Sequence, residues 1–108
     1  MTVKELAQKL GYKILCMPDE ERCVSGGYTG DLLSWVMGRL TADQAWVTIM
    51  SNVNIVAVAN LADPSCIILS ESVAPDEGVL EKAQEQGVNI LSTEKSSFLV
   101  CTEIAAVL

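Results

Sequence analysis

The residues best suited to chemistry in this sequence are glycines and small polar side chains, which gather in four short segments. These segments are residues 25–31, 51–54, 70–72 and 92–94. Glycines before a helix allow backbone N–H groups to approach an anion closely, and hydroxyl or amide side chains orient small ligands by hydrogen bonding. Turns and helix caps favour the same residue types for structural reasons alone. The four segments are therefore candidates for a ligand site or for caps and turns.

The glycine-rich segment 25–31 is the sharpest of the four and suggests a crevice with the residues that follow the next strand. The predicted ligand-binding residues are Gly26, Gly27, Thr29, Gly30, Asp31, Thr48, Asn52 and Asn54. The glycines and Thr29 would present backbone donors, whereas Thr48 and the asparagines would offer side-chain contacts. The spacing matches neither the P-loop nor the dinucleotide-binding fingerprint, and no lysine follows. Asp31 also stands where an anion would lie, so a tight turn with an acidic N-cap is the alternative.

Catalysis has few candidate groups, because the sequence contains no histidine. A serine or cysteine nucleophile would then need a lysine or a carboxylate as its base. Acidic clusters at 19–21 and 76–77 fall where solvated turns and helix starts are expected. We therefore predict no catalytic residue, no metal site and no cofactor. The alternative is an enzyme whose active site is completed by a dimer or partner interface, with Asp31 or Glu71 as base.

Length and charge narrow the class of protein further. The 108 residues fit one domain, and 14 acidic against 7 basic side chains give a net charge of -7, which disfavours binding to nucleic acid or membranes. The four cysteines lack C-x-x-C spacing and are predicted to be core residues in a reducing compartment. No apolar run resembles a signal peptide or a membrane span. We expect a single domain, residues 1–108, in the cytoplasm.

The elements that position these segments alternate along the chain. Apolar patterns, caps and breakers predict strands near 12–16, 22–25, 45–50, 66–69 and 88–91, the first two close enough to pair as a hairpin. They predict helices near 2–10, 32–40, 53–61, 75–86 and 97–107, with a capping box formed by Thr2 and Glu5. This alternation predicts a three-layer α/β/α sandwich around a mainly parallel, mixed five-stranded sheet. Ligands usually bind beyond the carboxyl ends of such strands.

Two helices are more apolar than a surface helix. Residues 52–62 have only asparagines as polar side chains, and 98–108 have only Thr102 and Glu103. A helix that is apolar on all sides must be covered on more than one side. We predict a homodimer formed through these helices, and the alternative is that one of them lies deep beneath its neighbours.

The order of three segments resembles a known family. Residues 22–34 (RCVSGGYTGDLLS), 46–48 (WVT) and 54–59 (NIVAVA) together are similar to stand-alone DRTGG-domain proteins of anaerobic bacteria, although the literal DRTGG string is absent. The resemblance implies a fold similar to the N-terminal domain of HPr kinase/phosphorylase. It also implies a regulatory role, as for DRTGG modules inside phosphate acetyltransferases and some inorganic pyrophosphatases, and a role accessory to fermentative redox or hydrogenase metabolism.

The sequence thus leads to a non-catalytic regulatory or scaffolding module that dimerises and binds a small metabolite or nucleotide at its strand-end loops. Without a P-loop, the chain is not an HPr kinase by itself. Besides the interface enzyme, a third interpretation is an interaction subunit that binds a partner protein and no small ligand.

Overall fold

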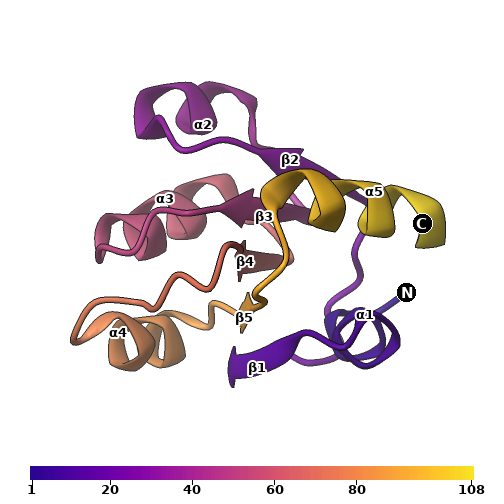
Figure 1. The fold of residues 1–108 in the computed structure, drawn as a ribbon. Coiled ribbons are helices and arrows are strands. Elements are labelled where there is room, and N and C mark those ends of the chain that lie inside the picture. The colour runs from indigo at the N-terminus through magenta and orange to yellow at the C-terminus, as the bar shows by residue number, and fades with distance from the viewer.

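The computed structural model describes residues 1–108 as three layers, with a five-stranded sheet between two layers of helices (Figure 1). The strands are β1 (Lys13–Cys16), β2 (Gly26–Thr29), β3 (Gln44–Thr48), β4 (Cys66–Leu69) and β5 (Ile90–Ser92). The helices are α1 (Val3–Leu10), α2 (Leu33–Arg39), α3 (Asn54–Ala62), α4 (Val79–Gln86) and α5 (Ser97–Val107). Helices α2, α3 and α4 cover one face of the sheet, and α1 and α5 cover the other.

The sheet is mixed, with the strand order β1-β5-β4-β3-β2. Strands β2, β3, β4 and β5 are parallel neighbours, and β1 pairs antiparallel with β5 at one edge. Each parallel connection needs a crossover helix, which α2, α3 and α4 provide on a single face. The predicted α/β/α sandwich with a mainly parallel sheet is confirmed.

The predicted hairpin between the first two strands is wrong. Strand β1 pairs with β5 and β2 with β3, so the two lie at opposite edges of the sheet. Residues 22–25 are not a strand of the sheet: Val3 N donates to Arg22 O, Val24 N to Met1 O, and Cys23 forms an isolated bridge with Thr2. The amino terminus therefore satisfies the backbone groups that a hairpin would have paired.

The strand predicted at residues 22–25 is displaced, and the strand begins instead at the two glycines that follow. Gly26 and Gly27 open β2 in parallel register with Gln44 and Ala45. A Cβ at Gly27 would meet the backbone oxygen of Ala45 at an ordinary 3.5 Å, so this position does not itself require glycine. Glycine therefore acts here as an edge-strand residue and not as a turn before a helix.

The core forms on both faces of the sheet because the central strands alternate between them. On β3 and β4, Trp46 and Ile67 point towards α2, α3 and α4, whereas Val47 and Ile68 point towards α1 and α5. All four residues of β4 are buried, as expected of a strand with helices on both sides. Two apolar clusters of 14 and 12 buried residues result, one on each face.

Most helix ends follow the predicted signals. Thr2 and Glu5 form the capping box, Gly11 ends α1 in the left-handed conformation, and the Ser96 hydroxyl accepts from Leu99 N. Helices α2 and α3 begin without a side-chain cap, and α4 begins at Val79 rather than at residue 75, so residues 70–78 form one long loop after β4.

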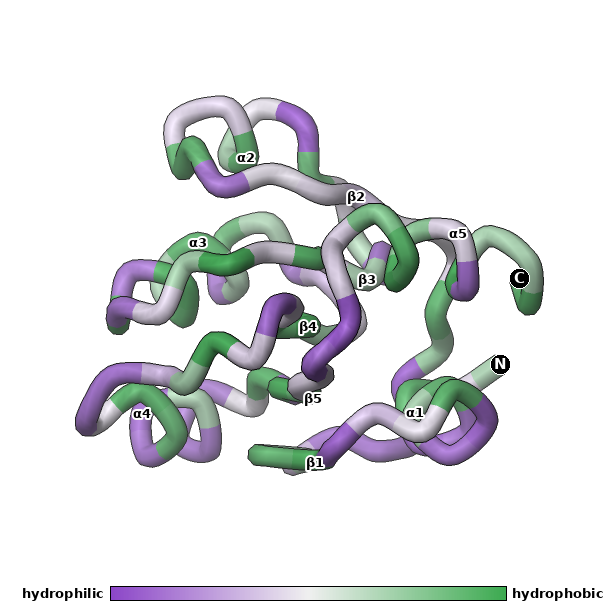
Figure 2. Tube along the Cα trace, in the orientation of Figure 1, coloured by the Kyte–Doolittle hydropathy of each residue, from purple (hydrophilic) through white to green (hydrophobic).

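The two apolar helices differ in how they are covered. Helix α3 lies between α2 and α4, which contact it on both sides. Helix α5 packs on β2 and β3 and keeps an exposed outer side, including Phe98 at 80% exposure. In the hydropathy view of Figure 2, both helices are largely hydrophobic, whereas α1 and α4 mix hydrophilic and hydrophobic segments. Helix α3 is therefore better covered than α5, although Ala57, Asn60 and Leu61 on α3 are still exposed.

The cysteines are all unpaired, and they divide between core and surface. Cys16 and Cys66 are buried as predicted, Cys101 is half-buried, and Cys23 is exposed, which corrects the prediction that all four lie in the core. Burial raises the pKa of the Cys66 thiol to about 12 and also raises that of Cys16. None of the five helices is both long and apolar enough to span a membrane.

Candidate functional site

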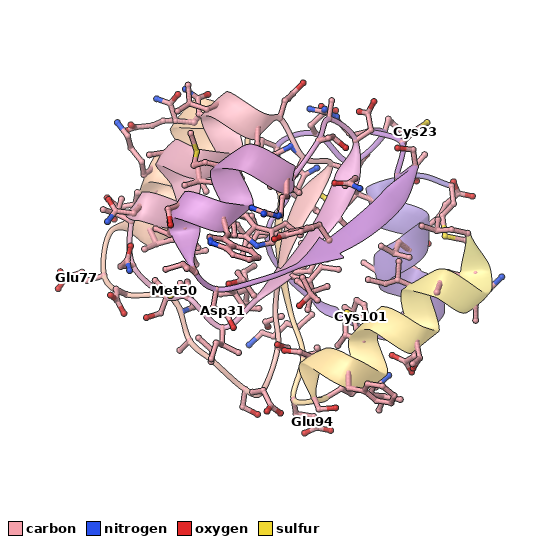
Figure 3. All side chains as sticks on the ribbon, turned by 90° about the horizontal axis from the view of Figure 1, so that it is seen from above. Cys23, Asp31, Met50, Glu77, Glu94 and Cys101 are labelled. Atoms are coloured by element: carbon pink, nitrogen blue, oxygen red, sulfur yellow. The ribbon has the colours of Figure 1, made fainter.

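The structure brings together only part of the predicted ligand-binding set. Thr29, Gly30, Asp31 and Thr48 meet where β2 and β3 end, whereas Gly26 and Gly27 lie at the other end of β2. Figure 3 looks onto the β2 edge, with Asp31 towards one end of the strand and Cys23 towards the opposite end. The two glycines therefore share a hollow with Thr29 but do not line the one that contains Gly30 and Asp31.

Asp31 joins the end of β2 to the end of β3. Its Oδ1 accepts hydrogen bonds from the Thr48 hydroxyl at 2.8 Å and from Ile49 N at 2.9 Å. Thr48 is completely buried, and its Oγ1 also accepts from Met50 N. Nearby, the Trp46 indole N–H donates to Gly30 O at 3.0 Å, and Gly30 N donates to Val47 O. These polar groups therefore bind one another and hold the loop before α2.

The predicted asparagines lie in the loop after β3. The Asn52 side-chain oxygen accepts from Asn54 N at 2.9 Å, which closes a turn at the start of α3. Thr29 likewise directs its hydroxyl to Val47 O at 3.1 Å. These side chains bond to the backbone or to one another, but none of them caps a helix: the N-caps of α2 and α3 are Leu32 and Val53, so Asp31 is not the acidic N-cap that was considered.

A surface hollow of about 480 Å³ lies beside residues 29–31 and includes two side chains that the sequence analysis did not single out. Trp35 is exposed on α2, and the Arg39 guanidinium stacks 3.9 Å from the centre of its ring. Such a cation–π pair combines a flat apolar face with a positive charge. The pair was missed because the α2 region was read only for its buried, core-facing positions.

A different crevice opens where the loops after β4 and β5 separate. The chain leaves β4 towards α4 on one face of the sheet and leaves β5 towards α5 on the other (Figure 1). Two adjacent parallel strands whose connections go to opposite faces leave a gap beyond their carboxyl ends, where α/β proteins usually bind ligands. No such divergence occurs between β2 and β3, because α2 and α3 lie on the same face.

The crevice has a volume of about 470 Å³ and is built from three segments. Its lining is formed by Gly11, Lys13 and Leu15 around β1, by residues 72–75 after β4, and by residues 92–95 at the end of β5. Glu71 N donates to Lys95 O, and Ser72 N to Thr93 O, so the two loops are joined at their base. Glu71 and Ser72 both have positive φ, 58° and 60°, an uncommon conformation that this pairing holds in place.

The charges around the crevice are distributed unequally. Lys95 Nζ lies 2.9 Å from Glu103 Oε2 and 3.2 Å from Leu10 O, so its charge is used in an ion pair. The four salt bridges of the protein involve Lys4, Arg22 and Lys95, which leaves Lys13 without a carboxylate partner. Glu94, on the rim, is the one acidic side chain in the lining.

Behind the crevice, Glu103 forms a small network with Lys95 and Tyr12. The pKa of the Glu103 carboxyl is kept below its ordinary value mainly by the Lys95 ammonium. The Tyr12 hydroxyl, which donates to Glu103 at 2.9 Å, lowers this pKa to a smaller extent. Burial and the adjacent carboxylate raise the pKa of Tyr12. This network fixes α5 to the loop after β5 and anchors one wall of the crevice.

The sequence analysis recognised only some of the residues that line this crevice. Segments 70–72 and 92–94 were recognised as polar stretches after strands, but Lys13 was not connected with them. Its position follows from the antiparallel pairing of β1 with β5, in which Lys13 lies opposite Ser92. No local signal shows that pairing, because the two strands are about 75 residues apart in sequence.

No group of three or more Cys, Asp or Glu side chains is placed to hold a metal ion. Of the two bases considered for an interface enzyme, Asp31 already accepts two hydrogen bonds, and Glu71 is exposed in the loop after β4. The chemistry offered by the carboxyl edge of the sheet is thus hydrogen bonding and charge.

The mixed sheet, the three crossover helices on one face and the loops at its carboxyl edge define a small three-layer α/β domain. The chain belongs to the DRTGG domain family, whose model matches residues 5–107. The resemblance drawn from the sequence is therefore confirmed.

A similar solved structure is that of the CBS and DRTGG domains of the regulatory region of Clostridium perfringens pyrophosphatase, complexed with its activator, diadenosine tetraphosphate. The likeness has a TM-score of 0.75 at 13% sequence identity, and it covers 95% of this chain but 45% of the other. At that identity the likeness concerns the fold, and this chain spans less than half the length of the pyrophosphatase region. Among curated proteins, none matches this sequence.

Proposed function

We propose that this chain is a regulatory or scaffolding module that forms a homodimer and binds a small metabolite or nucleotide. Membership of the DRTGG family supports a regulatory role, as does the shared fold with the regulatory region of a pyrophosphatase that carries a nucleotide activator. A role accessory to fermentative redox or hydrogenase metabolism and a cytoplasmic location stay predictions from the sequence.

The observation that carries the dimer is the exposed apolar side of α5. Phe98, Leu99 and Leu108 are exposed, and the side chains between them on the outer side are Thr102, Ala105 and Ala106. The one charged residue of the helix, Glu103, is paired with Lys95 at the crevice. An uncharged helix surface of this kind is typical of protein contacts.

The residues along α5 also suit a two-fold axis. Its large apolar side chains, Phe98 and Leu99, lie at the amino end, and the small Ala105 and Ala106 lie at the carboxyl end. Antiparallel packing against a second α5 would place each large pair over the small pair of the partner helix. Such self-complementarity is what an isologous interface requires.

An apolar hollow next to α5 extends this exposed surface. It has a volume of about 400 Å³ and lies between β2 and α5, where Cys101, Ile104 and Leu108 meet the open strand edge. The edge residues 26–29 carry no charge that would prevent a neighbouring chain from approaching. This hollow makes the α5 surface larger and adds to the case for a second copy as its partner.

The dimer is tested by Phe98→Ser, with the equally polar Leu61→Ser as the matched control, since Leu61 is 72% exposed but lies on α3. Burying one phenylalanine contributes about 1.5–3 kcal/mol, and a two-fold interface loses it twice. The dissociation constant of Phe98→Ser is therefore expected to rise by about 10² to 10⁴ in analytical ultracentrifugation. A wild-type protein that stays monomeric at micromolar concentration, or a dimer unaffected by Phe98→Ser, would contradict the proposal.

Ligand binding is tested separately by thermal stabilisation with nucleotides, including diadenosine tetraphosphate, with acyl phosphates and with common metabolites. A ligand at 100 times its dissociation constant adds about 2.7 kcal/mol to stability, which is readily measured. If no compound stabilises the protein and it copurifies with a stable partner, the interpretation as an interaction subunit without a small ligand takes its place.

A further inference from the structure

We propose that the crevice between the loops after β4 and β5 binds the phosphoryl group of a small organic molecule, with Lys13 as the charged contact. The inference rests on the proposed function, since it assigns a place and a chemical class to the ligand of the regulatory module. It moves the site from the ends of β2 and β3 to the ends of β4 and β5.

The first support is topological. Only between β4 and β5 do adjacent parallel strands send their connections to opposite faces of the sheet. The backbone bonds from Glu71 and Ser72 to the loop after β5 join the two loops at their base, and beyond Val73 they separate. The volume of about 470 Å³ is within the range of roughly 300–1,000 Å³ that small-molecule sites occupy.

The second support is the set of hydrogen-bond donors on residues that line the crevice. The Ser72 and Ser92 hydroxyls make no hydrogen bond within the protein, and the Thr93 Oγ1 accepts from Lys95 N but keeps its own proton. Together with the Lys13 ammonium, they provide four donors from three separate segments. A phosphoryl group has three strong acceptor oxygens, whereas a carboxylate has two, so the donor set favours the phosphoryl group.

The third support is charge. In a protein of net charge -7, Lys13 is a cation without a carboxylate partner, and it lies opposite Ser92 on the same surface of the sheet. The neighbouring Lys95 is already neutralised by Glu103, so Lys13 provides the positive charge that is free to pair with an anion. Leu15, Val73 and Pro75 supply an apolar wall for the rest of the molecule.

The experiment is an NMR titration of the ¹⁵N-labelled protein with inorganic phosphate, and with acetate and chloride at matched ionic strength. Phosphate is expected to shift the amide signals of residues 13–15, 72–74 and 92–95, with chloride producing no such localised change. Lys13→Gln should weaken phosphate binding about tenfold, as expected for the loss of one charge-assisted contact. The matched control is Lys9→Gln, because Lys9 also lacks a carboxylate partner but lies outside the crevice.

The possible outcomes separate this inference from the proposed function. Shifts that cluster elsewhere, for instance around residues 52–54, would overturn the crevice and leave ligand binding by the module intact. Equal binding of acetate, or a Lys13→Gln protein that binds phosphate like the wild type, would overturn the phosphoryl assignment. If neither phosphate nor any compound of the thermal-stabilisation screen binds, both the crevice and the ligand-sensing role fail, while dimerisation through α5 is still decided by ultracentrifugation.

Discussion

Replacing Asp31 with alanine provides the clearest test of whether this residue is structural or belongs to a ligand site. In the structure, one carboxylate oxygen accepts from the buried Thr48 hydroxyl at 2.8 Å and from Ile49 N at 2.9 Å. Alanine removes the acceptor from both donors at once. The Ile49 N–H is near the surface, where water can replace the carboxylate, so most of the cost comes from the Thr48 hydroxyl, which is completely buried.

The magnitude follows from that burial. Leaving a buried donor without its partner costs about 1–3 kcal/mol. For a domain of this size, the loss corresponds to a fall in Tm of roughly 5–15 °C, measured at one fixed protein concentration because dimerisation also affects Tm. Asp31→Asn keeps the side-chain oxygen as an acceptor, and we expect it to lose less than about 1 kcal/mol, since only the charge of the acceptor changes.

The assay is a double-mutant cycle with Thr48→Val, followed by urea denaturation of the four proteins. The two residues are expected to show a coupling free energy of about 1 kcal/mol or more, because they share one hydrogen bond. A coupling near zero, with Asp31→Ala as stable as the wild type, would refute the structural role. If Asp31→Asn instead kept full stability but removed a catalytic turnover, Asp31 would be the base of an interface enzyme.

Three further predictions concern stability and reactivity. Arg22→Met should destabilise the protein by about 1–2 kcal/mol in urea denaturation, because Arg22 contacts the Asp63 carboxylate and its backbone oxygen, both at 2.8 Å; an unchanged midpoint would speak against it. The Arg22 guanidinium lowers the pKa of Asp63, and Lys95 does the same for Glu103, so their contribution is complete above their ordinary values near 4 and lost as the pH falls further. Thermal melts should therefore show a steeper acid loss in the wild type than in Asp63→Asn, and parallel curves would contradict the linkage. Under native conditions, iodoacetamide should modify Cys23 quickly and leave Cys66 unmodified until unfolding, as peptide mass mapping can show; early labelling of the buried thiol would be inconsistent with this fold.

Local features of the fold were predictable because their causes lie within a few residues. The capping box of α1, the Ser96 cap and the buried strand 66–69 all depend on short-range hydrogen bonds or on the apolar pattern of one element. Alternation of strands and helices was sufficient for the layer architecture, since parallel strands require crossovers.

The candidate site was only half predictable, because part of it depends on contacts between distant segments rather than on causes within a few residues. Polar stretches at 70–72 and 92–94 are visible in the sequence, but the separation of their loops depends on which face of the sheet each following helix covers. Gly26 and Gly27 favoured a turn because glycine is depleted in strands, whereas the structure places both in the edge strand β2, where neither lies against an unusually close neighbour.

By itself, the sequence determined that this protein is an acidic α/β domain without histidine, that it belongs to the DRTGG domain family, and that two of its helices are unusually apolar. The tertiary structure decided that α2 and α4 contact α3 on both sides while α5 keeps an exposed apolar side, and that Lys13 lines one crevice with the loops after β4 and β5. Both outcomes depend on strand order and on the face that each helix covers. These are set by contacts between distant segments, which compete for the same apolar surface and cannot be ranked from local pattern alone.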